Sequence, residues 1–153
     1  MIPFTQVYKL TKSRMKALEL FCLIYDEKEV VRQGYFESEI QLLEQFCQEQ
    51  GLFYVKSSFK VLIDDPEKEI SDRGIRVAVD DPRKGLFFLY ISKSELSVYQ
   101  AAHAEITQNA EKLGTLLGYP HCCITFFEQN YQGYDLTLKP TSIYTNQKKK
   151  KND

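Results

Sequence analysis

The sequence predicts a single α+β domain in which about four helices cover one face of a three-stranded antiparallel sheet. Apolar residues recur at spacings of three and four in the first and last parts of the chain, which is typical of helices. In the middle of the chain every second residue is apolar, which is typical of strands. Because the strands follow one another in one block instead of alternating with helices, we expect antiparallel pairing. A length of 153 residues suits one hydrophobic core.

Two helices are expected before the strands, over residues 13–25 and 38–50. Each has an apolar stripe at helical spacing: Met15, Leu18, Cys22 and Tyr25 in the first, and Phe36, Ile40, Leu43 and Cys47 in the second. Because each stripe includes a cysteine, Cys22 and Cys47 are predicted to be core residues and not metal ligands.

Three strands are expected at 52–64, 74–80 and 86–91, and their order in the chain predicts an antiparallel meander. The first is expected to bend near Ser57. The last, "LFFLYI", is apolar on both faces, which predicts that it lies in the middle of the sheet or under helices. The main alternative is a mixed sheet with an additional strand at 29–36. An exposed sheet edge also makes a homodimer a hypothesis.

After the strands, one long helix is expected over 93–117 and a shorter one over 120–130. The stripe of the long helix consists of Tyr99, Ala102, Ile106, Ala110, Leu113 and Leu117. His103 lies on this stripe. It is therefore interpreted as a hydrogen-bonded core or boundary residue, or as an acid or base if a cleft is present.

The most suggestive stretch for chemistry is "LGYPHCC", in which two cysteines are adjacent. Pro120 suits the first position of a helix, which puts His121, Cys122 and Cys123 in its first turn, where partial positive charge favours a thiolate. Cys123 is expected to turn into the core, which leaves Cys122 as the candidate catalytic nucleophile or redox thiol. The competing interpretation makes both cysteines small core residues.

A metal site is the third interpretation, with Cys122, Cys123, His121 and His103 as candidate ligands and zinc or iron as the candidate ion. The chain lacks the Cys-x2–4-Cys pairs of a closed zinc site. On one straight helix His103 lies roughly 22 Å from the turn that precedes the cysteines. Its participation therefore requires a break near residues 107–109. A disulfide between the adjacent cysteines is disfavoured by strain.

The run Leu117-Gly118-Tyr119-Pro120-x-Cys122-Cys123 resembles an uncharacterised, mainly archaeal family, domain of unknown function 483, which is marked by LGYPxCC. The stretches "YISKSE", "AHAE" and "LGTLLGYP" resemble that family as well, so that the resemblance covers residues 14–128. The family has no activity to carry over. The resemblance therefore draws attention to the cysteine corner and implies no chemistry.

The net charge of −1 is unevenly distributed. The last nine residues, "TNQKKKKND", hold four Lys and one Asp, so the rest of the chain carries −4. That acidic body offers no footprint for nucleic acid. No membrane-spanning run or signal peptide is recognised, and a cytoplasmic protein without a membrane partner is expected. Residues 1–144 are expected to form the domain, with an extended arm from about 131, and 145–153 to form a disordered lysine-rich tail.

The function expected from the sequence is that of a structural or binding module in which "GYPHCC" forms a packing corner. One alternative is a thiol- or metal-dependent enzyme or sensor centred on Cys122. A second is a nucleic-acid-associated protein that uses its tail. The sequence contains no Gly-rich phosphate loop, Gly-x-Ser-x-Gly elbow or His-Glu-x-x-His motif, so it assigns no reaction and no small-molecule ligand.

Overall fold

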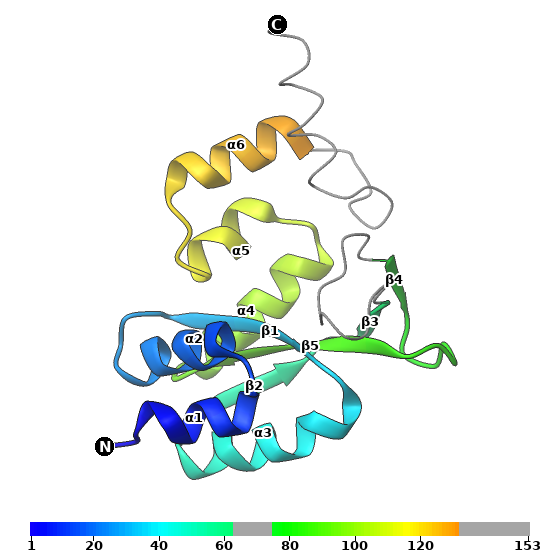
Figure 1. Ribbon diagram of the computed structural model, residues 1–153. Coiled ribbons are helices and arrows are strands. Elements are labelled where there is room, and N and C mark those ends of the chain that lie inside the picture. The colour runs from blue at the N-terminus through cyan, green and yellow to red at the C-terminus, as the bar shows by residue number, and fades with distance from the viewer. Residues whose placement is uncertain (63–74, 132–153) are drawn as a thin grey trace, which may run out of the picture.

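The computed structural model describes residues 1–62 and 75–131, and the predicted arm and tail lie outside these residues. The described part forms a single α+β domain (Figure 1). Its helices are α1 (Phe4–Thr11), α2 (Arg14–Ile24), α3 (Glu37–Glu49), α4 (Glu95–Ile106), α5 (Ala110–Leu116) and α6 (His121–Tyr131). Its strands are β1 (Val30–Tyr35), β2 (Phe53–Lys56), β3 (Phe59–Leu62), β4 (Ile75–Ala78) and β5 (Gly85–Ser92).

Strand β5 lies at the centre of the sheet. It pairs antiparallel with β1 on one side and with β2 and β3 on the other, and β4 pairs with β3. The predicted meander is therefore wrong in its last step, because β5 pairs with β3 and not with β4. A strand that is apolar on both faces is best covered in the centre, whereas the exposed residues of β4 suit an edge. Strand β1 confirms the alternative strand at 29–36, although all pairings among the described strands are antiparallel.

The predicted bend at Ser57 is confirmed, and it separates β2 from β3. The backbone N–H of Ser57 donates to the carbonyl of Phe88 at 2.8 Å. The Ser57 hydroxyl oxygen accepts from the backbone N–H of Phe88 at 3.0 Å. The serine side chain thus replaces one rung of the backbone ladder and lets two short strands follow the same neighbour.

Helices cover both faces of the sheet, so the prediction of a single covered face is wrong. Figure 1 shows α4, α5 and α6 stacked on one side and α1 and α3 on the other. Alternate residues of β5 explain the arrangement. Phe87, Leu89 and Ile91 pack in a core with α1, α2 and α3, whereas Tyr90 packs with α4 and the end of α5. Both faces of β5 are apolar, and each therefore requires its own cover.

The predicted helices form near their expected positions, but two of them expose a different face. Helix α3 buries Ile40, Leu43 and Cys47 as predicted. Helix α2 instead buries Ala17, Leu20 and Leu23, which leaves Cys22 half-buried. Helix α4 buries a face of small residues, with Ser97, Val98, Ala101, Ala104 and Glu105 inside. Its bulky residues Tyr99 and Ile106 are exposed, together with His103.

The long helix predicted over 93–117 is divided into α4 and α5. Gln108 has a left-handed backbone with φ 56°, which cannot continue a helix. Asn109 then starts α5, and its side-chain oxygen accepts from the backbone N–H of Lys112 at 2.9 Å. The break at 107–109 thus lets the chain turn so that α5 and α6 stack above α4. Among the helices of the described segments, none combines the length and the apolar character needed to cross a bilayer.

Candidate functional site

The cysteine corner is a tight turn between α5 and α6. Gly118 has φ 77°, which favours glycine, and its backbone N–H donates to the carbonyl of Thr115 at 3.0 Å. Helix α6 begins at His121, one residue after the predicted start. Pro120 stands directly before it, and its carbonyl accepts from the backbone N–H groups of Cys123 and Ile124 at 2.9 and 3.1 Å. The first turn of α6 is therefore well formed.

Ile124, and not Cys123, is the residue of this turn that enters the core. A Cβ placed on Gly114 would meet the Cγ1 atom of Ile124 at 2.8 Å, so α5 and α6 approach as closely as a glycine permits. Ile124 is only 6% exposed. Successive residues of a helix point about 100° apart. With Ile124 directed at α5, both Cys122 and Cys123 remain on the surface. The predicted burial of Cys123 is therefore wrong, as is the interpretation of both cysteines as core residues.

The two exposed thiols influence each other. A hydrogen bond from the Cys123 thiol to the sulfur of Cys122 and the charge of that sulfur both raise the pKa of the Cys123 thiol. Cys122 lies directly before Cys123, in the first turn of α6.

The predicted metal site is not assembled by the described residues. In the segments 1–62 and 75–131 no group of three or more His, Cys, Asp or Glu side chains could hold a metal ion. His121 and His103 are both exposed, and they do not join Cys122 and Cys123 in such a group. Two adjacent sulfurs do not fit the four-ligand geometry of a structural zinc site.

An ionic cluster around the buried carboxylate of Glu105, on the α4 face of the sheet, was not predicted from the sequence. Glu105 is 3% exposed, and it accepts from Arg32 Nε at 2.6 Å, from Arg32 Nη2 at 2.5 Å and from Arg76 Nη2 at 2.7 Å. The hydroxyl of Tyr90 donates to the same carboxylate. Burial opposes ionisation of Glu105. The hydrogen bonds and charge of Arg32 outweigh this effect of burial and lower the pKa of Glu105. Burial and the charge of Glu105 raise the pKa of Tyr90.

The arginines of this cluster also stack on aromatic rings. The guanidinium of Arg32 lies 3.7 Å from the ring centroid of Phe88, and that of Arg76 lies 4.4 Å from the centroid of Phe59. The cluster therefore fastens α4 to β1, β4 and β5. The sequence does contain one sign of this cluster, which is Arg32 inside the apolar run "EVVRQGYF". A charge within a buried strand requires a partner of opposite charge.

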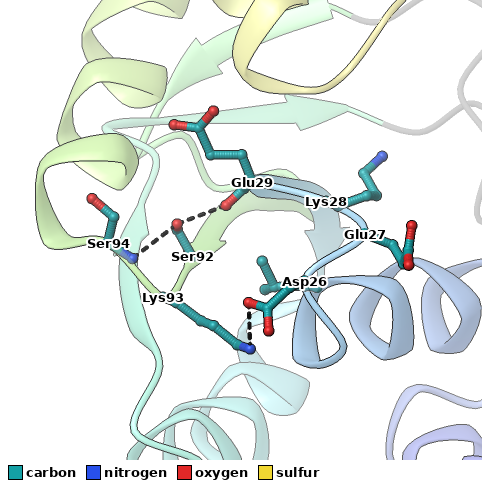
Figure 2. A pocket seen from close by; sticks show the side chains of 8 residues that line it. Asp26, Glu27, Lys28, Glu29, Ser92, Lys93 and Ser94 are labelled. Carbon is teal, nitrogen blue, oxygen red and sulfur yellow. Dashed lines mark hydrogen bonds and ion pairs between the residues drawn. The ribbon is translucent and has the colours of Figure 1, made fainter.

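A shallow hollow between the end of α2 and the end of β5 has a volume of about 350 Å³ (Figure 2). Its polar groups largely pair with one another. Lys93 Nζ lies 2.7 Å from Asp26 Oδ1, and the Ser92 hydroxyl donates to the carbonyl of Glu29 at 2.6 Å. The Ser92 oxygen in turn accepts from the backbone N–H of Ser94 at 3.0 Å. These pairs account for how the two loops are held together, and they leave this hollow without an evident ligand.

Comparison with known proteins adds no function. No family model matches the chain, and no match was found among curated proteins or among solved structures.

Proposed function

We propose that this domain is a thiol-dependent binding module, in which Cys122 and Cys123 form an exposed dithiol that captures a partner by thiol–disulfide exchange. The observation that carries the proposal is the exposure of both sulfurs at the start of α6. A cysteine that serves only packing is buried. These two contribute nothing to the core, while Ile124 beside them does.

The chemistry divides between the two thiols. The thiolate of Cys122 attacks one sulfur of a disulfide, a new S–S bond forms between them, and the old S–S bond breaks. The leaving thiolate takes a proton from solvent. Cys123 keeps its proton, because the neighbouring sulfur and its charge raise the pKa of the Cys123 thiol. The expected product is a mixed disulfide on Cys122.

A second exchange step, in which Cys123 releases the partner, is disfavoured by geometry. The Cα atoms of adjacent residues lie about 3.8 Å apart across a trans peptide, which is shorter than the roughly 4.4–6.8 Å spanned by ordinary disulfides. Closing a bond between Cys122 and Cys123 would therefore distort the first turn of α6. The mixed disulfide persists until a small thiol reduces it, so the module captures partners and does not turn them over. The cytoplasm is part of this proposal: thiols are kept reduced there, so the pair is present as a dithiol and the mixed disulfide is transient.

Oxidised glutathione provides the test of this proposal. The protein is incubated with it, and the adduct is located by peptide mass spectrometry. We expect one glutathione on Cys122, loss of the adduct in Cys122→Ser, and retention in Cys123→Ser. Loss of two hydrogens without an adduct would mean that the cysteines pair with each other. Either that result or the absence of any change in mass would overturn the proposal.

A soft metal ion is a second candidate ligand for the same pair of sulfurs. Exposed adjacent thiolates suit an ion such as Cu⁺, which accepts few and soft ligands. The described segments offer no third side chain to Cys122 and Cys123, so zinc or iron would need ligands from another chain.

A nucleic-acid role rests on the lysine tail at 145–153, which lies outside the described residues. A homodimer through an open sheet edge likewise rests on the sequence and on the edge position of β4.

A further inference from the structure

A second hollow, which we call the lysine pocket, lies between the start of α3 and the β4–β5 turn, away from the cysteines. It has a volume of about 550 Å³. Its charged lining consists of Glu37, Lys56, Lys60, Arg83 and Lys84. The lining of the lysine pocket thus contains four cationic side chains and one carboxylate. The lining of the hollow in Figure 2 contains three carboxylates and two lysines.

The lysines of this pocket are held by groups that do not neutralise them. Lys60 is buried to about nine-tenths, and its ammonium donates to the backbone carbonyls of Asp81 and of Arg83, the latter at 3.1 Å. Lys84 Nζ lies 4.3 Å from the ring centroid of Phe36. Carbonyl dipoles and ring faces attract an ammonium group but leave its full charge in place.

Within the segments 1–62 and 75–131, the carboxylates that line this pocket or pair with its cations are too few to balance them. Arg83 is occupied by Asp81, with Nε to Oδ1 at 2.9 Å and Nη2 to Oδ2 at 2.8 Å. Lys56 meets Glu37 at 3.3 Å, but the side chains are 38% and 67% exposed, so this pair is weak. Four cations against these two carboxylates leave a charge of +2 on the described residues around the pocket.

The fold holds the cations in place. A Cβ on Gly85 would lie 2.9 Å from the carbonyl oxygen of Val61, so the β4–β5 turn is pressed against β3 at this point. That contact positions Lys84 at the end of the turn. Lys56 lies with its ammonium 4.7 Å from the ring centroid of Phe87 in β5. Lysines from β2, β3 and the turn are therefore gathered around one space, where their mutual repulsion costs free energy until an anion occupies it.

We propose that the lysine pocket binds a phosphate monoester of a small organic molecule. A dianion matches the local charge of +2, and the oxygens of a phosphate accept hydrogen bonds from several ammonium groups at once. The pocket is of the size that holds a whole small ligand. The exposed side chain of Val79 and the half-buried ring of Phe36 offer apolar surface to its organic part.

Calorimetric titration with phenyl phosphate tests this assignment, with inorganic phosphate and the monoanion phenyl sulfate as comparisons. We expect phenyl phosphate to bind more tightly than either. Affinity should fall as the pH is lowered through about 6, where a phosphate monoester loses its second charge while lysines keep theirs. Tighter binding of inorganic phosphate would indicate a site for the free anion and would overturn the organic part of the proposal.

Substitutions separate the pocket from general attraction of anions. Lys84→Gln and Lys56→Gln should each weaken binding about tenfold, because each removes a charge-assisted contact. Lys84→Arg should retain most of the affinity. Lys28→Gln is the matched control, since Lys28 pairs with Glu19 outside the pocket and the net charge changes equally. An equal loss in the control, unchanged affinity in both pocket variants, or no binding of phenyl phosphate to the parent protein would refute the proposal.

Discussion

The guanidinium of Arg32 binds the buried carboxylate of Glu105 through two hydrogen bonds, although the two residues are 73 positions apart in the chain. This pair joins the edge strand β1 to the inner face of α4. It also explains why α4 turns its bulky residues outward, because the helix must present Glu105 to the sheet.

Removal of Arg32 is the first test of this account. Arg32→Met should lower the free energy of unfolding by about 3 kcal/mol, since it leaves a buried carboxylate with one arginine fewer. Urea denaturation measures the change. Lys93→Met serves as the control, because Lys93 and Asp26 are paired with side chains 43% and 78% exposed, and its cost should stay below about 1 kcal/mol. Equal costs for the two variants would contradict a stabilising role of the cluster.

The same carboxylate predicts a dependence of stability on pH. The hydrogen bonds and charge of Arg32 outweigh burial and lower the pKa of Glu105 in the folded protein, whereas an unfolded glutamate titrates near about 4.3. The unfolded chain therefore binds more protons in the window between the two values, and the stabilisation is lost as the pH falls through the folded pKa. Urea midpoints measured from pH 7 down to about 3 should fall less steeply in Glu105→Gln. A parallel decline in both proteins would show that other carboxylates control acid unfolding.

The contact between Gly114 and Ile124 predicts a packing penalty at the cysteine corner. Gly114→Ala places a Cβ 2.8 Å from Ile124 Cγ1 and should destabilise the protein by about 1 kcal/mol, the clash exceeding the gain in helix propensity. In an Ile124→Ala background the same substitution should stabilise. The double-mutant cycle measured by thermal unfolding gives the coupling directly. Additive effects would mean that α5 and α6 are not in close contact here.

The buried cysteine of α3 supplies an internal reference for thiol reactivity. Cys47 is 1% exposed, and burial together with the charge of Glu44 raises the pKa of its thiol to about 12. It should resist thiol reagents in the native protein and react fully in urea. Cys22 is half-buried and should react at an intermediate rate. Rapid native labelling of Cys47 would show that α3 opens readily from the sheet.

Local patterns predicted the elements better than their contacts. The stripe of α3, the bend at Ser57 and the central position of "LFFLYI" depend on neighbours within a few residues, and all three are confirmed. The pairing of β5 with β3 and the burial of Glu105 depend on partners far along the chain, which periodicity does not reveal. The sequence analysis also assigned the wrong buried face to α4, because it followed the bulky residues Tyr99 and Ile106, which are exposed. Its sheet-facing side consists of small residues around an ionic contact.

The turn and the helix of the cysteine corner were predicted correctly, but the burial of Cys123 was predicted wrongly. Pro120 and Gly118 predicted the turn and the helix that follows. The direction of each side chain in that first turn was set by the fit of Ile124 against Gly114, which only the packed structure shows. An error of one residue rotates a helix by about 100° and exchanges a core residue for an exposed one.

The exposed dithiol is tested most directly by the alkylation rates of individual cysteines in the native protein. The protein is treated with iodoacetamide at neutral pH, and the modified peptides are quantified over time by mass spectrometry. We predict that Cys122 is modified first, that Cys123 follows more slowly, and that Cys47 remains unmodified, with the fast phase lost in Cys122→Ser. If Cys122 and Cys123 react no faster than Cys47, the thiols are not available to a partner and the proposed function is wrong.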